Sequence, residues 1–464
     1  MRKTLYTLLL CIAPVATALA GGLLHNTNQH IAFVRMMARG ATSDIDAVYS
    51  NPAGSAFLDH QGWTLSLNNQ SAFQRRDVEA EFPLFPEGKR QYDGKASAPI
   101  LPSAIVAYQR NKWTFSGMFA MIGGGGKCSY DQGLPMFDAA VMAGIYSRTS
   151  ALVNSNPAAA AVLGGPVMPN QYDLNTAMRG RQYIYGLQFG AAYRFNSHIS
   201  AFAGVRFNYF DGNYRGHVNA TAGEALAEKL AILGQGNTLA NIELDCDQTG
   251  WGITPVIGFN YKVKGLTLAA KYEFKTNLNI ENDTKTLNVA PTEFRSALSE
   301  FEHGVNTPSD LPAVLSLAAG YEILPNRLRA TFEFHHYDDK NAEMASDKQR
   351  ALTRGTLEYL LGVEWDINKT FTVSAGGQIT DYGLSDAYQR HTSFACDSYS
   401  IGFGGAVNLT KKLRMNLGYF RTIYSNYTKV TPAGTPGYCN TGLAGTDVFK
   451  RKNKVFGIGF DYKF

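Results

Sequence analysis

The glycine-rich run at 123–127 is the segment of this chain closest to a known chemical motif. Its sequence, GGGGK, has the glycines and the lysine of a phosphate-binding loop. Such a loop needs a glycine five positions before Gly126 and Ser or Thr after the lysine, whereas this chain has Met121 and Cys128 there. The run therefore predicts no nucleotide site.

A second polar cluster, His335-His336 with Asp338-Asp339, has the residue types of a metal site. In a strand, adjacent side chains point to opposite faces, so the two histidines cannot bind one ion together. We interpret the cluster as polar residues near a loop. No arrangement of Ser, His and an acid favours a lipase, and the sequence predicts no enzyme, no metal and no cofactor.

The first element along the chain has the features of an export signal. Arg2 and Lys3 precede the apolar stretch Leu5 to Ala18, and Ala18-Leu19-Ala20 is a small-residue cleavage site. An uncleaved membrane anchor is the alternative, but the stretch is short and Pro14 interrupts it. Residues 1–20 are therefore predicted to be a signal peptide.

Composition limits the function of the exported chain. Only 17% of the residues are charged. Loss of Arg2 and Lys3 with the leader lowers the net charge from +5 to +3, which makes no case for nucleic acid. After the leader no run of 18 apolar residues predicts a spanning helix. An exported chain can still stand in a membrane if its strands close into a barrel.

The main pattern is alternation of apolar and polar residues. In the closing segment 455–464, Phe456, Ile458, Phe460 and Phe464 lie on one face, with small or polar residues between them. The same pattern predicts fourteen strands, an even number that suits a transmembrane barrel over 62–464. The predicted strands are 62–73, 99–110, 113–123, 181–195, 198–211, 248–262, 265–281, 311–323, 326–338, 354–366, 369–381, 396–409, 412–426 and 451–464.

The links between these strands alternate in length, as in outer-membrane barrels. The short links are Asn111-Lys112, Asn196-Ser197, Val263-Lys264, Leu324-Pro325, Asn368 and Lys411. Two long links, within 134–168 and 220–244, have helix-forming stretches with apolar faces. The two loops could simply pack on each other, or they could bind an apolar ligand through Leu134, Met136, Phe137, Val141, Met142, Ile145, Leu226, Leu230 and Leu233.

Four cysteines follow the leader, each in or beside a long loop. We expect disulfides between Cys128 and Cys246 and between Cys396 and Cys439, although four free thiols are the alternative.

Inward-facing basic side chains are a further candidate site. Arg206, Lys271, Arg329 and Arg414 could meet a ligand carboxylate, or they could pair with Glu273, Glu333 or the N-terminal segment, which we favour.

Residues 21–61 do not alternate, and about a third of them are apolar, which favours packing inside the barrel as a plug. This segment resembles the N-terminal hatch of the FadL family of outer-membrane long-chain fatty acid transporters. The matching residues are Arg39-Gly40-Ala41, Asp44, Asp46, Asn51-Pro52-Ala53 and Ala56-Phe57-Leu58, and Leu311-Pro312 entering a strand also matches. A second Asn-Pro-Ala at 156–158 shows that the tripeptide alone is not specific.

The resemblance implies a fourteen-stranded barrel in the bacterial outer membrane, plugged by a hatch and without catalytic activity. It implies passive uptake of fatty acids or aromatic hydrocarbons by a monomer in contact with outer-membrane lipid. Ligand would bind between the two apolar loops and leave through the wall at a kink in the third strand, here Gly123, Gly124, Gly125 and Gly126. A surface adhesin or structural barrel with a permanent plug, and a porin for small solutes, are the alternatives.

Overall fold

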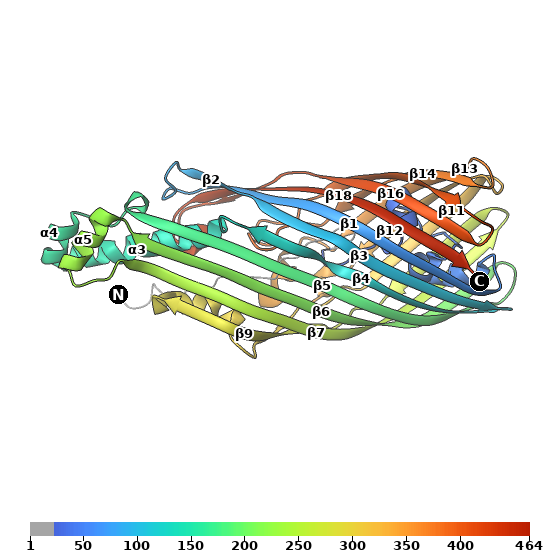
Figure 1. Ribbon diagram of the computed structural model, residues 1–464, viewed down its shortest axis with the longest axis horizontal. Coiled ribbons are helices and arrows are strands. Elements are labelled where there is room, and N and C mark those ends of the chain that lie inside the picture. The colour runs from blue at the N-terminus through green and yellow to red at the C-terminus, as the bar shows by residue number, and fades with distance from the viewer. Residues whose placement is uncertain (1–22) are drawn as a thin grey trace.

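The computed structural model describes residues 23–464, so the predicted signal peptide at 1–20 lies outside the described residues. The chain forms one antiparallel sheet that closes on itself (Figure 1). Closure is made by β1 (Gly62–Glu81), which pairs with β3 (Gly94–Arg110) on one side and with β18 (Gly445–Lys463) on the other. Leu67 lies opposite Phe460, so the closing strand does meet the first strand.

The barrel has fourteen strands in residues 23–464, as the alternation predicts, and four of them are each split into two segments. The split strands are β2 (Lys89–Tyr92) with β3, β8 (Leu266–Glu273) with β9 (Asn279–Ala290), β10 (Asn306–Pro308) with β11 (Val314–Leu324), and β16 (Leu413–Tyr424) with β17 (Tyr427–Thr431). The unsplit strands besides β1 and β18 are β4 (Trp113–Tyr130), β5 (Tyr172–Arg194), β6 (Ile199–Ala222), β7 (Thr238–Val263), β12 (Leu328–Tyr337), β13 (Leu357–Asp366), β14 (Phe371–Asp381) and β15 (Ser398–Asn408).

Strands β5, β6 and β7 are much longer than predicted, with 23, 24 and 26 residues. A tilted membrane strand needs about 9–11 residues. The excess extends beyond the barrel as a ribbon that carries α3 (Pro135–Ser155), α4 (Pro157–Leu163) and α5 (Glu224–Ile232) at its tip (Figure 1, left). The predicted boundaries are too short because they stop where large outward-facing apolar residues stop.

The outer face of the barrel is apolar. Phe456, Phe460 and Phe464 are 48%, 40% and 58% exposed, as expected for the outward side of the closing strand. Their neighbours Val455 and Asn453 are buried and face the lumen. A soluble protein would cover such a face, whereas a membrane barrel turns it to lipid. In residues 23–464, no helix is long and apolar enough to cross a membrane.

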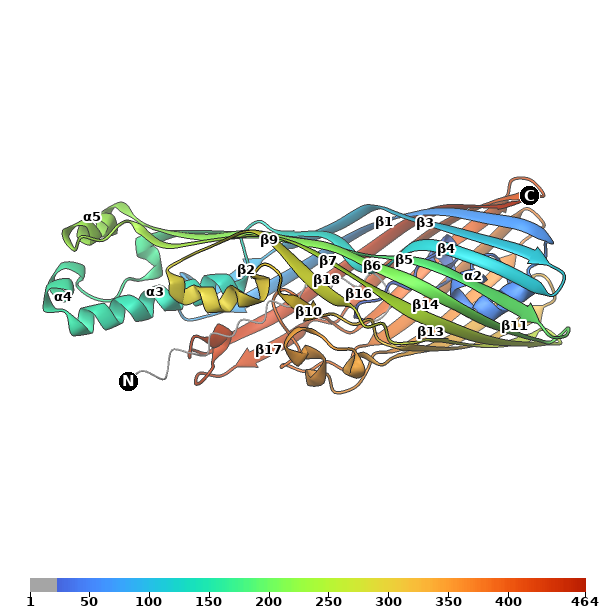
Figure 2. The same ribbon diagram turned by 90° about the horizontal axis from the view of Figure 1, so that it is seen from below.

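The N-terminal segment fills one end of the lumen. It contains α1 (Ile31–Met36), α2 (Ala47–Ser50) and the 3-10 helix η1 (Pro52–Phe57). Figure 2 shows these elements inside the barrel at the end that carries the short links, opposite α4 and α5. We call this the short-turn end. The other 3-10 helices are η2 (Pro169–Gln171), η3 (Thr292–Phe301), η4 (Asp339–Asn341), η5 (Ala345–Ala351) and η6 (Tyr438–Asn440).

Candidate functional site

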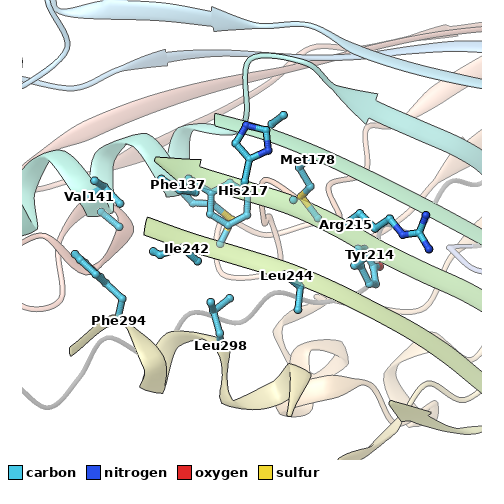
Figure 3. A pocket seen from close by; sticks show the side chains of 15 residues that line it. Phe137, Val141, Met178, Tyr214, Arg215, His217, Ile242, Leu244, Phe294 and Leu298 are labelled. Atoms are coloured by element: carbon cyan, nitrogen blue, oxygen red, sulfur yellow. The ribbon is translucent and has the colours of Figure 1, made fainter. Parts of the chain in front are cut away.

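An apolar groove lies between α3 and the inner face of the ribbon made by β5, β6 and β7 (Figure 3). The enclosed cavity is about 60 Å³, and the space reaches about 650 Å³ only when the open mouth is included, so the groove as it stands is narrow. The apolar lining comes from α3, the three strands and η3, namely Met136, Phe137, Ala140, Val141, Ala177, Met178, Tyr214, Val218, Ile242, Leu244, Phe294 and Leu298.

The two basic side chains at the groove, Arg215 and His217, have partners on the other face of the ribbon. Arg215 donates from Nε to Oδ1 of Asp245 at 3.0 Å, and Nε2 of His217 lies 3.3 Å from Oδ1 of Asn175. Tyr214 and Val218, which alternate with them along β6, are the buried side chains. The groove can therefore exclude water from an apolar molecule but holds no cation for a buried carboxylate.

A buried carboxylate fixes α3 over the groove. Asp138, in the first turn of α3, accepts from Nη1 of Arg90 at 2.7 Å, from the hydroxyl of Tyr92 at 2.8 Å and from Oγ1 of Thr176 at 3.0 Å. Burial raises the pKa of Asp138, and Arg90 offsets part of that rise. Because these donors come from β2 and β5, the helix is tied to two strands.

The structure divides the nine predicted ligand residues into two groups. Met136, Phe137 and Val141 line the groove. The others, Leu134, Met142, Ile145, Leu226, Leu230 and Leu233, pack into the hydrophobic cluster around it. The interpretation that the two loops pack on each other therefore describes α4 and α5, which contact one another. On α3, the buried side chains of Met136 and Val141 also line the groove.

The groove residues on β5, β6, β7 and η3 are not among the nine predicted from the sequence. Tyr214, Gly216 and Val218 alternate with Arg215 and His217, so the strand period continued past the predicted end at 211. That continuation was the available signal, because a membrane barrel strand need not end where its lipid contact ends.

The wall of the barrel is interrupted between β3 and β4. The two strands pair on either side of a gap that begins at Ser97 and ends at Ala104. On the β4 side, two register shifts fall within 121–126, and Gly124 and Gly126 have φ values of +79° and +78°. These β-bulges coincide with the predicted kink at Gly123 to Gly126, and only glycine adopts such angles at little cost.

The β3 side of the gap carries two prolines, Pro99 and Pro102, within the interrupted stretch. Proline has no N–H to donate to a neighbouring strand, so the ladder there cannot be complete. Pro99 and Pro102 both fall within the strand predicted over 99–110, and the two prolines are a sequence signal against a regular strand there. The gap is thus encoded on both strands, by proline on one and glycine on the other.

The N-terminal segment lies against the bent part of β4. The backbone N–H of Asn26 donates to Ile122 O at 2.8 Å, and His25 and Gly123 form an isolated bridge. The side chain of Gln29 reaches Met121 O at 3.2 Å. The polypeptide that plugs the lumen therefore also lines the interruption in the wall.

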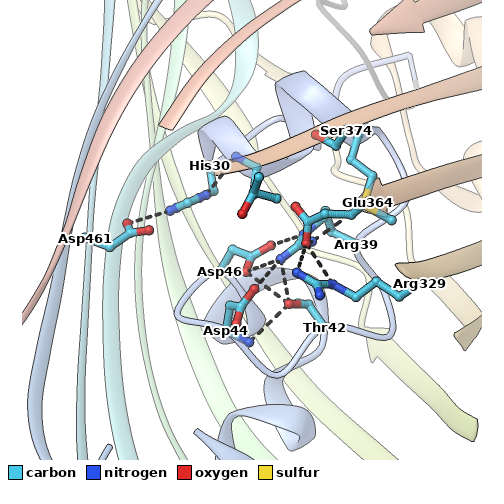
Figure 4. A network of polar contacts seen from close by, with 12 residues as sticks. His30, Arg39, Thr42, Asp44, Asp46, Arg329, Glu364, Ser374 and Asp461 are labelled. Atoms are coloured by element: carbon cyan, nitrogen blue, oxygen red, sulfur yellow. Dashed lines mark hydrogen bonds and ion pairs between the residues drawn. The ribbon is translucent and has the colours of Figure 1, made fainter. Parts of the chain in front are cut away.

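A charged network holds the plug at the short-turn end (Figure 4). Glu364 on β13 is fully buried and accepts from Arg35, from Arg39 at 3.4 Å and from Nε of Arg329 at 2.8 Å. Arg39 also pairs with Asp46 at 2.6 Å. Two of these arginines belong to the plug, so one wall carboxylate joins plug and barrel.

The wall beneath α1 is built for close contact. A Cβ atom on Gly376 would lie 1.5 Å from Met36 O, and one on Gly404 would lie 2.8 Å from Cβ of Arg35. No other residue type could stand at Gly376 without moving the helix. Glu333 adds two bonds to the plug backbone, from the N–H groups of Arg39 at 2.9 Å and Gly40 at 2.8 Å.

The Asn-Pro-Ala motif is an anchor of the plug. Asn51 caps η1 by accepting from Gly54 N at 3.1 Å, and its Nδ2 donates to Oδ1 of Asn260 on β7 at 2.9 Å. Pro52 occupies the first turn, where a missing N–H costs nothing. Ala53 O accepts from Oγ of Ser200 on β6 at 2.7 Å. The motif therefore docks the plug against two adjacent strands.

The inward bases pair within the protein, as favoured from the sequence. Glu273 pairs with Arg206 and, at 2.8 Å, with Lys271, while Arg329 uses Glu364 and Asp366. Arg414 donates to Oγ1 of Thr372 at 3.2 Å. His335 lies two residues from the end of β12, where it is buried between Glu333 at 2.7 Å and Glu358 at 3.0 Å.

The expected disulfides do not form, since Cys128, Cys246, Cys396 and Cys439 are free thiols. For the first pair the register gives the reason. Cys128 lies opposite Gly180, Gly180 opposite Tyr214, and Tyr214 opposite Cys246. Three strand spacings separate the two cysteines by about 14 Å, twice the largest Cα separation that a disulfide spans. The pairing was predicted from the loops that carry the cysteines, and those loops do not show that β5 and β6 lie between Cys128 and Cys246.

No family model matches the sequence, and no curated protein matches it. Solved structures do match. A Pseudomonas aeruginosa FadL homologue has a TM-score of 0.64 at 14% identity, over 95% of this chain and 98% of that one. The P. putida toluene transporter TodX has a TM-score of 0.53 at 13% identity, over 92% and 97%. The Ralstonia pickettii toluene transporter TbuX has a TM-score of 0.52 at 13% identity, over 90% and 94%.

The closed barrel and these matches define the class of the molecule as a fourteen-stranded antiparallel β-barrel of the outer-membrane type. Within that class the chain has the FadL fold over nearly its whole length. At these identities the likeness is one of fold.

Proposed function

We propose that this protein is a passive outer-membrane transporter of hydrophobic molecules, either long-chain fatty acids or aromatic hydrocarbons. The observation that carries the proposal is the groove beneath α3, which is lined by apolar side chains and lies beyond the barrel. Each methylene that leaves water for such a groove gains about 0.8 kcal/mol. A fatty acid would keep its carboxylate at the open mouth, because the lining holds no cation for it.

The exit that we propose is lateral. The gap between β3 and β4 offers an interruption in the hydrogen-bonded wall, and the plug blocks the straight route along the lumen. An apolar ligand that left through the wall would enter lipid without crossing the polar lower lumen. The solved structures with this fold include toluene transporters, which supports a hydrophobic cargo.

Uptake and binding assays test the proposal. Cells with and without the gene are given labelled oleate and labelled toluene, and binding of both to purified protein is measured in detergent. We expect faster uptake of at least one compound with the gene present. Failure of both compounds to bind or enter would contradict transport of these two classes.

A groove-filling variant links that activity to the site. Ala140 is buried in the lining, so Ala140→Trp should fill the groove and lower binding at least tenfold. The matched control is Ala151→Trp, on the exposed side of the same helix. Equal binding by the two variants would place the ligand elsewhere.

A wall variant tests the lateral route separately. Replacing Pro99 and Pro102 with valine restores two N–H donors to β3 and favours pairing with β4. We expect binding in the groove to be unchanged and uptake to fall. If uptake stays normal while amide exchange shows that 98–103 has become protected, the lateral route is wrong.

The alternatives make different predictions in the same preparations. A porin should let sugars swell liposomes, whereas a plugged transporter should give little swelling. The ribbon that carries α4 and α5 beyond the barrel is compatible with an adhesin. An adhesin would bind a surface partner and would not need the groove, so Ala140→Trp would leave adhesion unaffected.

A further inference from the structure

The short-turn end carries a ring of exposed basic side chains. Links join β3 to β4, β5 to β6, β7 to β8, β11 to β12, β13 to β14 and β15 to β16 at this end. Five of these six links, in or directly beside them, carry at least one exposed cation, namely Arg110 and Lys112, Lys264, Arg327, Lys369, and Lys411 with Lys412. The bases are therefore spread around the circumference and not gathered in one patch.

Carboxylates at this end are mostly occupied. Asp59 pairs with Lys463 at 2.5 Å, Asp366 pairs with Arg329 at 2.8 Å, and Asp461 lies 3.0 Å from His30. In residues 23–464, Lys264 and Lys369 form no ion pair, and the same holds for Arg110, Lys411 and Lys412. The ring consequently has an excess of positive charge that the chain itself does not neutralise.

An aromatic girdle lies next to the ring on the outer face. Trp63, Trp113 and Trp365 are 53%, 46% and 45% exposed, and each lies within two residues of the short-turn end of its strand. Such rings mark the level of the lipid headgroups in membrane proteins. The exposed cations directly beyond them therefore stand at the depth of the lipid phosphates.

We propose that this ring binds the headgroups of anionic phospholipids. The proposal depends on the barrel standing in a membrane and not on what it transports. Lysine and arginine near a membrane surface attract acidic lipid, and each contributes a few-fold preference. An acidic protein partner would need its contacts on one side of the barrel, whereas a lipid annulus meets bases at five separate links.

Tryptophan quenching by brominated lipids tests the proposal directly. The chain has four tryptophans. Three lie in the girdle, whereas Trp251 is 73% exposed and lies twelve residues before the end of β7 at Val263, near the opposite interface. Trp251→Phe leaves only the girdle to report. A second variant that keeps only Trp251 reports on lipid far from the ring.

The protein is reconstituted with brominated phosphatidylglycerol or with brominated phosphatidylcholine at the same fraction. We expect the girdle to show about a two- to five-fold preference for phosphatidylglycerol, weakened by salt. The variant that keeps only Trp251 should show a preference near one. Equal quenching of the girdle by the two lipids would overturn the proposal.

Charge-matched variants decide whether the ring is responsible. Replacing Lys264, Lys369, Lys411 and Lys412 with glutamine should bring the girdle preference close to one. The control removes four exposed lysines from the opposite half of the molecule, Lys89, Lys95, Lys285 and Lys340, and should keep the preference. A preference that survives in the first variant, or disappears in the control, contradicts the assignment to the ring.

Discussion

The two ends of the lumen are stabilised by different interactions. At the outer end, α3 covers a groove of apolar side chains, and Asp138 supplies a buried polar anchor beside it. At the short-turn end, the plug is held by Glu364 and its arginines and by glycines that admit α1 against the wall.

This difference separates binding from retention. Apolar contacts are non-directional and tolerate ligands of different shape, and each contributes little, so a ligand can be released. Buried ion pairs demand fixed geometry, and removing one partner costs several kcal/mol. The outer end, which would exchange ligand, is therefore held mainly by non-directional contacts. The short-turn end, which would prevent leakage, is held by contacts of fixed geometry.

The largest expected effect comes from breaking the charged network at the short-turn end. Glu364→Gln leaves three guanidinium groups around a neutral amide, which should weaken docking of the plug by about 3–5 kcal/mol. Hydrogen exchange of 31–57 should accelerate, and current through planar bilayers should rise. The control is Asp59→Asn, which breaks the exposed pair with Lys463. If exchange in 31–57 is unchanged, the network does not hold the plug.

The next largest effect is expected at Asp138, the polar anchor of the outer end. Asp138→Ala removes the acceptor that Arg90, Tyr92 and Thr176 share and should destabilise α3 by about 2–3 kcal/mol. Ligand affinity should fall with it, as measured by titration calorimetry. Asp131→Asn is the control, because Asp131 is exposed and lies 3.8 Å from Arg179.

The same carboxyl gives a pH dependence with a defined sign. Burial raises the pKa of Asp138 above its usual range. The stabilisation of α3 is therefore complete below the usual pKa of aspartate and declines as the pH rises through the raised value. Asp138→Asn should remove this dependence while retaining more stability than Asp138→Ala. An unchanged pH profile would show that another group is responsible.

A smaller effect is expected at the two Asn-Pro-Ala sequences. Asn51→Ala removes bonds to Gly54 and Asn260 inside the barrel and should weaken the plug by about 1–3 kcal/mol. Asn156→Ala removes the cap of α4 at the exposed tip and should leave the plug unaffected. Plug exchange that responds equally to both would contradict a role specific to Asn51.

The sequence predicted the barrel well because alternation is a local signal. All fourteen strands and both loop classes follow from side-chain period and link length. The groove was predicted only in part, since Met136 and Val141 lie on a helix whose apolar face is visible, whereas Phe294 reaches the site through tertiary packing. The partner of Arg329 was also missed, because no local pattern shows that Glu364 lies beside it.

The smallest expected effect concerns the four cysteines, all of which lie in the outer half. Their thiols are free, so packing and the hydrogen bonds of Asp138 must hold the outer end together without covalent bonds. Thiol titration after denaturation without reductant should give four reactive groups in the mature chain. A reductant should leave both ligand binding and thermal stability unchanged. Because Gly180 and Tyr214 separate Cys128 from Cys246, detection of a bond between those two cysteines would require a different strand order and would overturn the register itself.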